Sequence, residues 1–208
     1  MPPRYATDDH DLMIALIRDN GFAVLVTRDA DDATGMSANH LPLEWDPDGG
    51  PEGRLLGHMA AGNMQWQAFD GNTPALAVFQ GPHAYLSPRW YVSRDVVPTW
   101  NYAAVHVTGR PRVIGDAEQS SSVIASLVSH YEGPDGWSMD GMGAEFREMM
   151  LKGIVAFEMP IERIEGKQKM SQNRTPEDVA AAVAELRALG GDQSLAVAEI
   201  MERCNVGE

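Results

Sequence analysis

The sequence predicts a mainly β protein, an antiparallel barrel or sandwich with helices at its periphery. Three observations support this prediction. About six segments have the composition of strands, several of them are joined by polar or Gly-containing turns, and strands and helices do not alternate as they do in parallel α/β folds. An open α+β sheet is the main alternative.

The predicted strands are short apolar or alternating segments. From 154 to 164, apolar residues such as Phe157 alternate with Glu158 and Glu162, which is typical of a strand with one buried face. Pro42 cannot donate a hydrogen bond to a sheet, so we expect an edge or a bulge at this position. We predict strands over residues 22–27, 36–45, 54–60, 75–86, 99–114 and 154–164.

Capping residues mark the helices. Thr7 and Asp116 can each cap a helix, and the segment from Thr175 to Asp178 resembles a capping box with proline at the first helical position. The predicted helices cover residues 7–20, 63–69, 144–151 and 176–189, with others beginning after Asp116 and Asp192. We expect a barrel domain over 1–174 and a helical appendage over 175–208, packed on the barrel or on a partner subunit.

Composition and charge limit the function classes. The 208 residues carry 30 acidic and 16 basic side chains, a formal net charge of −14. An acidic surface repels nucleic acid and anionic lipid, so direct nucleic-acid binding is disfavoured. The one cysteine, Cys204, allows no intrachain disulfide. We see no signal peptide and no apolar run that could span a bilayer, and we expect a soluble, cytoplasmic protein.

Standard catalytic motifs are missing. The sequence has no G-x-S-x-G, H-E-x-x-H or P-loop pattern, and its six histidines show no local metal-ligand spacing. We therefore expect no metal site and cannot name a catalytic residue.

Basic residues concentrate in two segments of this acidic chain. Residues 86–112 and 166–174 contain seven lysines and arginines and a single acid, Asp95. If the two segments meet in space, they form a site for an anion. The alternative is that these cations are solvated at strand ends and in loops.

The same segments contain flat and amide side chains, among them Trp100, Asn101 and Gln172. A planar heteroaromatic ring needs apolar walls and a few fixed polar groups at its edge. An anion next to a planar ring describes a nucleotide or a flavin. The alternative is that the aromatic residues belong to the core or to a dimer interface.

Four sequence words carry a family resemblance. They are GHMAAGNMQW, YLSPRWY, VPTWNYAAVHVTG and IERIEGKQKMSQNR, at 57–66, 85–91, 97–109 and 161–174. Their content and order resemble the PaiB family, whose members are described as FMN-binding negative transcriptional regulators. That family belongs to the FMN-binding split-barrel superfamily, with pyridoxamine-phosphate oxidases and small flavin reductases as distant relatives.

The resemblance implies a six-stranded antiparallel split barrel that forms a homodimer, with two FMN sites at the dimer interface. It also implies the residues that contact the cofactor. These are Ser37, Asn39, His40, His58, Met59, Ala60, Asn63, Trp66, Thr99, Trp100, Asn101, Tyr102, Lys167, Lys169, Gln172, Asn173 and Arg174.

Side-chain chemistry suggests roles for some of these residues. Lys169 and Arg174 suit the phosphate. Asn101 and Gln172 suit the polar edge of the ring, and an apolar wall would come from Trp66 or Trp100.

One position departs from the family pattern. Ala61 stands where an arginine is usual, and Met64 replaces a proline. Loss of one charge-assisted phosphate contact costs about 1.5–3 kcal/mol. We therefore expect weak FMN binding, or another anion, unless Lys167, Lys169 or Arg110 compensates.

The resemblance leaves three functions open. The first is a negative transcriptional regulator that acts indirectly or through its flavin. Direct contact with DNA is disfavoured because the helices over 176–203 contain six acidic residues and only two arginines, whereas DNA phosphates require positive charge. The second is an FMN-dependent oxidoreductase of the pyridoxamine-phosphate-oxidase type. The third is a haem-binding split barrel with an axial ligand from His40, His58, His83 or His106.

Overall fold

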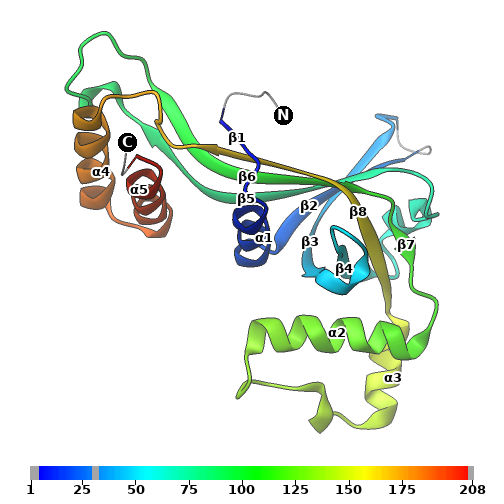
Figure 1. The fold of residues 1–208 in the computed structure, drawn as a ribbon. Coiled ribbons are helices and arrows are strands. Elements are labelled where there is room, and N and C mark those ends of the chain that lie inside the picture. The colour runs from blue at the N-terminus through cyan, green and yellow to red at the C-terminus, as the bar shows by residue number, and fades with distance from the viewer. Residues whose placement is uncertain (1–4, 30–32, 206–208) are drawn as a thin grey trace. The chain divides into compact units, whose positions relative to one another are not determined.

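A computed structural model describes residues 5–29 and 33–205 (Figure 1). The strands in these residues are β1 (Ala6–Thr7), β2 (Phe22–Arg28), β3 (Met36–Asp46), β4 (Arg54–Ala60), β5 (Ala75–Leu86), β6 (Thr99–Gly109), β7 (Arg112–Val113) and β8 (Ile154–Lys169). The α-helices are α1 (His10–Asp19), α2 (Ala117–Glu132), α3 (Ala144–Lys152), α4 (Pro176–Leu189) and α5 (Asp192–Asn205). The prediction of a mainly β fold with peripheral helices is confirmed.

Six long strands appear where the sequence predicts them; of the two short strands, β1 lies outside the predicted strands and β7 lies within the predicted strand 99–114. β5 has the predicted bounds, and β2, β3 and β4 differ from prediction by at most one residue. The predicted strand 99–114 ends at Gly109 because Pro111 cannot donate to the sheet, and the chain resumes pairing in β7. β8 runs five residues beyond its predicted end, to Lys169.

The strand order is β1-β8-β4-β3-β2-β5-β6, with β7 and β6 also pairing with β8. β3 changes partner along its length: residues up to Pro42 pair with β2, and residues from Leu43 pair with β4. Pro42 itself pairs with Phe22 of β2, and pairing with β4 begins only at Leu43, so this residue has one neighbouring strand, which fits the predicted edge. The proline lies where the ladder passes from one neighbour to the other, and the next N–H, that of Leu43, donates to the Gly21 carbonyl oxygen at 2.8 Å.

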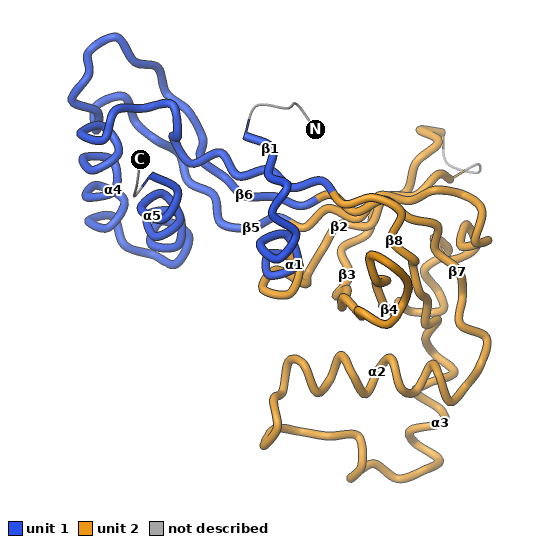
Figure 2. The backbone as a smooth tube through the Cα atoms, viewed as in Figure 1, with its two compact units in different colours: residues 1–16, 80–105, 165–208 blue, residues 17–79, 106–164 orange. Residues whose placement is uncertain are grey.

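The chain divides into two compact units (Figure 2). Unit 1 contains the described parts of 1–16, 80–105 and 165–208, and unit 2 contains those of 17–79 and 106–164. β5, β6 and β8 each contribute residues to both units.

Unit 2 has a core of apolar and aromatic side chains. Phe69 and Phe157 are 5% and 0% exposed, and their ring centroids lie 4.7 Å apart. Val123 and Leu127 of α2 pack against Leu56 of β4. Burial of these apolar surfaces is the main stabilising contribution in this part of the chain.

Glu158 departs from the exposed position that the alternation predicts. It is only 8% exposed, on the central part of β8. Its two carboxylate oxygens each accept a 2.5 Å hydrogen bond, one from Arg54 and one from Arg112. Two arginines thus compensate a buried charge that the sequence pattern places in solvent.

In unit 1, α4 and α5 pack against each other (Figure 1). Leu186 and Met201 are fully buried, and so is Met170 in the segment that precedes α4. Thr175 caps α4 as predicted, with its hydroxyl accepting from the Asp178 N–H at 3.3 Å. Leu189, the last residue of α4, is exposed.

Candidate functional site

The predicted cofactor residues fall into two groups, one in each unit. In unit 1, five of them line a cavity of about 220 Å³, which we call the anion pocket. Its lining residues are Tyr5, Val97, Thr99, Asn101, Lys169, Ser171, Asn173 and Arg174. The lining contains two cations, several hydroxyl and amide groups and no acid, which is the chemistry that holds a phosphate or another oxyanion.

Lys169 connects two strands at this pocket. It is the last residue of β8, and Thr99 is the first residue of β6. The Lys169 ammonium donates to the Thr99 hydroxyl and to the Trp100 carbonyl oxygen, the latter at 2.8 Å. Lys169 and Thr99, which are 70 positions apart in the sequence, are therefore in direct contact through the Lys169 ammonium.

Arg174 is oriented by an aromatic ring. Its guanidinium carbon lies 4.8 Å from the centroid of the Tyr91 ring, and Tyr91 is only 8% exposed. Such stacking reduces the freedom of a long side chain and holds its charge in one place. Asn173, next to it, accepts a 2.8 Å hydrogen bond from the Tyr5 hydroxyl.

Other predicted residues of unit 1 lie outside the pocket lining. Trp100 is 54% exposed, and its ring centroid lies 5.9 Å from that of Tyr85. The Lys167 ammonium lies 5.7 Å from the centroid of the Tyr102 ring. The Gln172 amide is bonded to backbone groups of its own segment, since it accepts from the Met170 N–H at 2.8 Å and donates to the Gln168 carbonyl at 2.7 Å.

In unit 2, Gln65 organises the predicted group, although it was not among the predicted residues. It is 5% exposed, and its amide nitrogen donates to the Leu25 carbonyl at 3.0 Å and to the Thr27 hydroxyl at 3.1 Å. Its amide oxygen accepts from Asn39 at 3.0 Å. The Gln65 amide nitrogen also donates to the Ser37 carbonyl at 3.3 Å. This buried amide therefore fixes the part of β3 that contains Ser37 and Asn39.

Residues 60–66 form a turn stabilised by side chains. Asn63 caps the 3₁₀ helix Met64–Ala68 by accepting from the Gln65 N–H at 3.1 Å. The Trp66 indole donates to the Ala61 carbonyl at 3.0 Å. Ala60 ends β4 and is exposed.

His58 and Met59 are adjacent on β4 and therefore point to opposite faces of the sheet. Met59 is 2% exposed and belongs to the core. Burial lowers the pKa of His58, whose Nδ1 is buried and has no hydrogen-bond partner among the described residues. His40 is exposed, and its ring stacks on Phe22 with centroids 5.8 Å apart.

The predicted cation cluster is smaller than the sequence map indicates. Arg110 is paired with Glu162 at 2.7 Å, and Arg112 is paired with Glu158 at 2.5 Å. Both pairs belong to unit 2, whereas Lys169 and Arg174 belong to unit 1. Nearness in sequence was misleading because the cations at 110 and 112 have acidic partners on β8.

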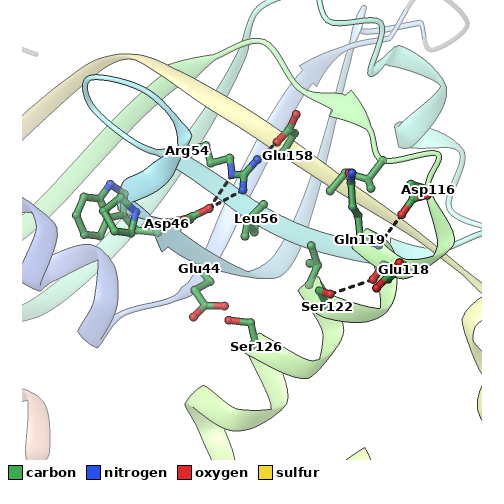
Figure 3. A pocket seen from close by; sticks show the side chains of 14 residues that line it. Glu44, Asp46, Arg54, Leu56, Asp116, Glu118, Gln119, Ser122, Ser126 and Glu158 are labelled. Atoms are coloured by element: carbon green, nitrogen blue, oxygen red, sulfur yellow. Dashed lines mark hydrogen bonds and ion pairs between the residues drawn. The ribbon is translucent and has the colours of Figure 1, made fainter.

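A larger cavity in unit 2, of about 870 Å³, has the opposite charge (Figure 3). Arg54 lies between Asp46 and Glu158 and is bonded to both, at 2.7 and 2.5 Å. Glu44 and Glu118 line the same cavity, together with Asp116. This excess of carboxylates repels a phosphate, so the anion pocket is the better site for one.

Two further cavities lack a comparable donor set. One, of about 800 Å³ in unit 2, is lined by Gln65 with Arg28, Asp29 and Asp70 among others. The other, of about 410 Å³ in unit 1, lies along α4 and α5 and is mainly apolar. Among the described residues that line these four cavities there is no histidine.

The described residues contain no group of three or more His, Cys, Asp or Glu side chains that could hold a metal ion. Among the helices in the same part of the chain, none has both the length and the apolar composition of a membrane span.

Comparison with known structures shows the fold. An FAD- and haem-binding protein from Mycobacterium smegmatis superimposes with a TM-score of 0.60 at 14% identity, covering 85% of this chain and 80% of that one. A flavocytochrome from Azotobacter vinelandii gives a TM-score of 0.59 at 12% identity, covering 80% and 70%. The predicted split-barrel fold is confirmed, with β1 and β7 added to the six long strands.

Sequence comparison shows the family. The chain is 35% identical over 189 residues to "Protease synthase and sporulation protein PAI 2" of Bacillus subtilis, which covers 89% of this chain and 88% of that one. It is 30% identical over 226 residues to an uncharacterized protein of Emericella nidulans, covering 89% of each. The family model described as "Putative FMN-binding domain" matches residues 1–163. The chain therefore belongs to this FMN-binding domain family and is a PaiB homologue.

Proposed function

We propose that this chain binds FMN and that the anion pocket takes the FMN phosphate. The observation that carries the proposal is the convergence of Lys169 and Arg174 on one cavity without an acid in its lining. Charge-assisted hydrogen bonds from such cations are the strongest contacts that a protein makes with phosphate. The membership of the chain in an FMN-binding family supports this assignment.

The pocket accommodates one end of the cofactor. Its volume of about 220 Å³ is below the range of about 300–1,000 Å³ that is usual for small-molecule sites. The ring would need a wall outside the pocket, and we assign this wall to the exposed Trp100, whose carbonyl oxygen accepts from Lys169. Bound FMN would supply redox chemistry through its ring, while these residues hold and orient it.

We further propose that a second copy of the chain completes the site, as the resemblance implies. The exposed aromatic side chains of Trp100 and Tyr85, 54% and 46% accessible, suit a surface that a partner covers. The second predicted group, with Asn39 held by Gln65, remains a prediction for flavin contact. Sedimentation equilibrium tests the dimer: a single-subunit mass at micromolar concentration would contradict it.

FMN and riboflavin distinguish the proposed phosphate site from a ring site, because riboflavin lacks the phosphate. We expect the wild-type protein to bind FMN at least tenfold more tightly, as about 1.5–3 kcal/mol per charged contact predicts. Lys169→Met should remove most of this preference and leave riboflavin affinity nearly unchanged. Fluorescence quenching of both flavins measures it.

Lys152→Met is the matched control, since Lys152 is a largely exposed cation on α3 paired with Glu148. This variant should bind both flavins as the wild type does. Equal affinities of the wild type for FMN and riboflavin would contradict the proposed phosphate site.

For the biological role we propose regulation through the flavin ligand or a partner protein, without direct DNA contact. The exposed pair of Arg187 and Glu202 connects α4 and α5 at 2.7 Å, which leaves these acidic helices with little positive charge for DNA phosphates. An electrophoretic mobility assay tests this role. Saturable, salt-sensitive binding to a promoter fragment from the chain's own gene neighbourhood would contradict it.

A further inference from the structure

A buried polar pair forms one wall of the anion pocket. Asn101 and Ser171 are 0% and 3% exposed. The Asn101 amide nitrogen donates to the Ser171 hydroxyl at 2.9 Å, and that hydroxyl donates back to the Asn101 amide oxygen at 3.3 Å. The two side chains thus satisfy each other in an environment where an unpaired polar group is costly.

The backbone conformation of Ser171 is unusual. Its φ is +64°, in the left-handed region that residues other than glycine seldom adopt. Among the described residues, only Tyr5 (φ +68°) and Ser171 combine a side chain with a positive φ, and both line the anion pocket. Such conformations persist where surrounding contacts hold them, and they concentrate at functional sites.

The left-handed residue sets the path of the chain around the pocket. Lys169 comes before it, and Asn173 and Arg174 come after it, in a turn closed by the hydrogen bond from the Arg174 N–H to the Ser171 carbonyl at 2.9 Å. All of these residues line the same cavity. If Ser171 returned to a negative φ, the two cations would no longer face one cavity.

We propose that Asn101 is a positioning residue, which holds Ser171 in the left-handed conformation and thereby keeps Lys169 and Arg174 at the anion pocket. This inference rests on the proposed function and deepens it. Asn101 need not touch the phosphate itself, because its amide acts through the Ser171 hydroxyl.

Glycine at 171 separates this role from a purely structural one. Glycine adopts a positive φ without a side-chain clasp. In Ser171→Gly the turn should therefore form without help from Asn101, and Asn101→Ala in that background leaves no polar side chain unpaired. Ser171→Ala removes the hydroxyl but keeps the backbone penalty.

The experiment measures FMN and riboflavin affinities for the wild type, four variants at the pocket and one control variant. Asn101→Ala and Ser171→Ala should each reduce the FMN preference about tenfold, and Asn101→Ala/Ser171→Ala should be no worse than either single variant, because both remove one interaction. Asn101→Ala/Ser171→Gly should recover a preference within about threefold of the wild type. Asp116→Ala, which removes the cap of α2 in unit 2, should lower the melting temperature without changing the preference.

Each outcome is decisive. Two results overturn the positioning role while the proposed function stands. One is an FMN preference of Asn101→Ala/Ser171→Gly that is as weak as that of Asn101→Ala, and the other is an unchanged FMN preference in Asn101→Ala. A wild type with no FMN preference contradicts the proposed function, and the same variants are then titrated with inorganic phosphate by 31P NMR. If the wild type binds phosphate and the variants rank in phosphate affinity as predicted above for FMN preference, the positioning role at an anion site is supported. A wild type that does not bind phosphate overturns both the positioning role and the anion site.

Discussion

The Lys169 ammonium and the Trp100 carbonyl oxygen lie 2.8 Å apart, so the end of β8 is fastened to the beginning of β6 by a cation. A backbone carbonyl satisfies part of the ammonium's hydrogen-bonding capacity without neutralising its charge. These bonds hold the Lys169 side chain at the pocket that it lines.

Gln65→Leu should destabilise the protein by about 2 kcal/mol. The Leu25 carbonyl, the Thr27 hydroxyl and the Asn39 amide would each lose their hydrogen bond to the buried Gln65 side chain. Urea unfolding measures this change in the free energy of unfolding. Gln67→Leu, at an exposed neighbour, is the control and should have little effect. Equal stability of the two variants would show that the network around Gln65 contributes nothing.

Glu158→Gln should cost about 2–3 kcal/mol, because it leaves Arg54 and Arg112 without their shared carboxylate. The cost is lower than for a fully buried pair, since Arg112 is 61% exposed. Glu162→Gln, which breaks the exposed pair with Arg110 on the same strand, should cost less than about 1 kcal/mol. Chemical denaturation of both variants compares them, and the reverse order would contradict the account of the buried pair.

Asp178 should make the stability of unit 1 sensitive to acid. Its carboxylate accepts from the backbone N–H groups of Ser93 and Val92, at 2.9 and 2.8 Å, and these hydrogen bonds, with nearby Arg174, lower its pKa below the ordinary value of 3.8. A carboxyl with a lowered pKa in the folded state stabilises the fold at neutral pH, and this contribution is lost as the pH falls through that lowered value.

Asp178→Asn should accordingly have a lower melting temperature than the wild type at pH 7. The two melting temperatures should approach each other as the pH falls toward 3. Thermal unfolding followed by circular dichroism at a series of pH values measures both effects. A constant difference between the two proteins at every pH would show that charge on Asp178 is not the cause.

Ala61→Arg tests a second position for the phosphate, since it restores a cation that the family pattern places there, at a residue that does not line the anion pocket. The backbone of Ala61 is already fixed, with its N–H donating to the Gly153 carbonyl at 2.9 Å and its carbonyl accepting from Trp66. With the phosphate in the anion pocket, we expect the variant to bind FMN within about threefold of the wild type. Fluorescence titration checks the affinity, and a gain of about tenfold or more would mean that the phosphate lies at residue 61 instead.

The long strands could be predicted because their alternation and bounding turns are local. β5 has its predicted bounds for this reason, whereas the two-residue β1 depends on a partner far away in sequence, at Gly166 and Lys167. The burial of Glu158 was missed because the arginines that compensate it come from β4 and β7. Periodicity records a side chain's own polarity and not that of its neighbours in space.

The residues that line the anion pocket were predictable only in part. The words around Trp100 and Lys169 named five residues of the anion pocket, but no sequence signal located Tyr5 or the left-handed Ser171 in it. Gln65 was overlooked because a glutamine in a turn is ordinarily exposed, and only the strands beside it show that it is buried.

A crystal structure of the complex with FMN tests the central claim most directly. We predict the FMN phosphate within hydrogen-bond distance of the Lys169 ammonium and the Thr99 hydroxyl, with Ser171 still at a positive φ. Phosphate density at any other place, with the anion pocket holding only water, would contradict the account.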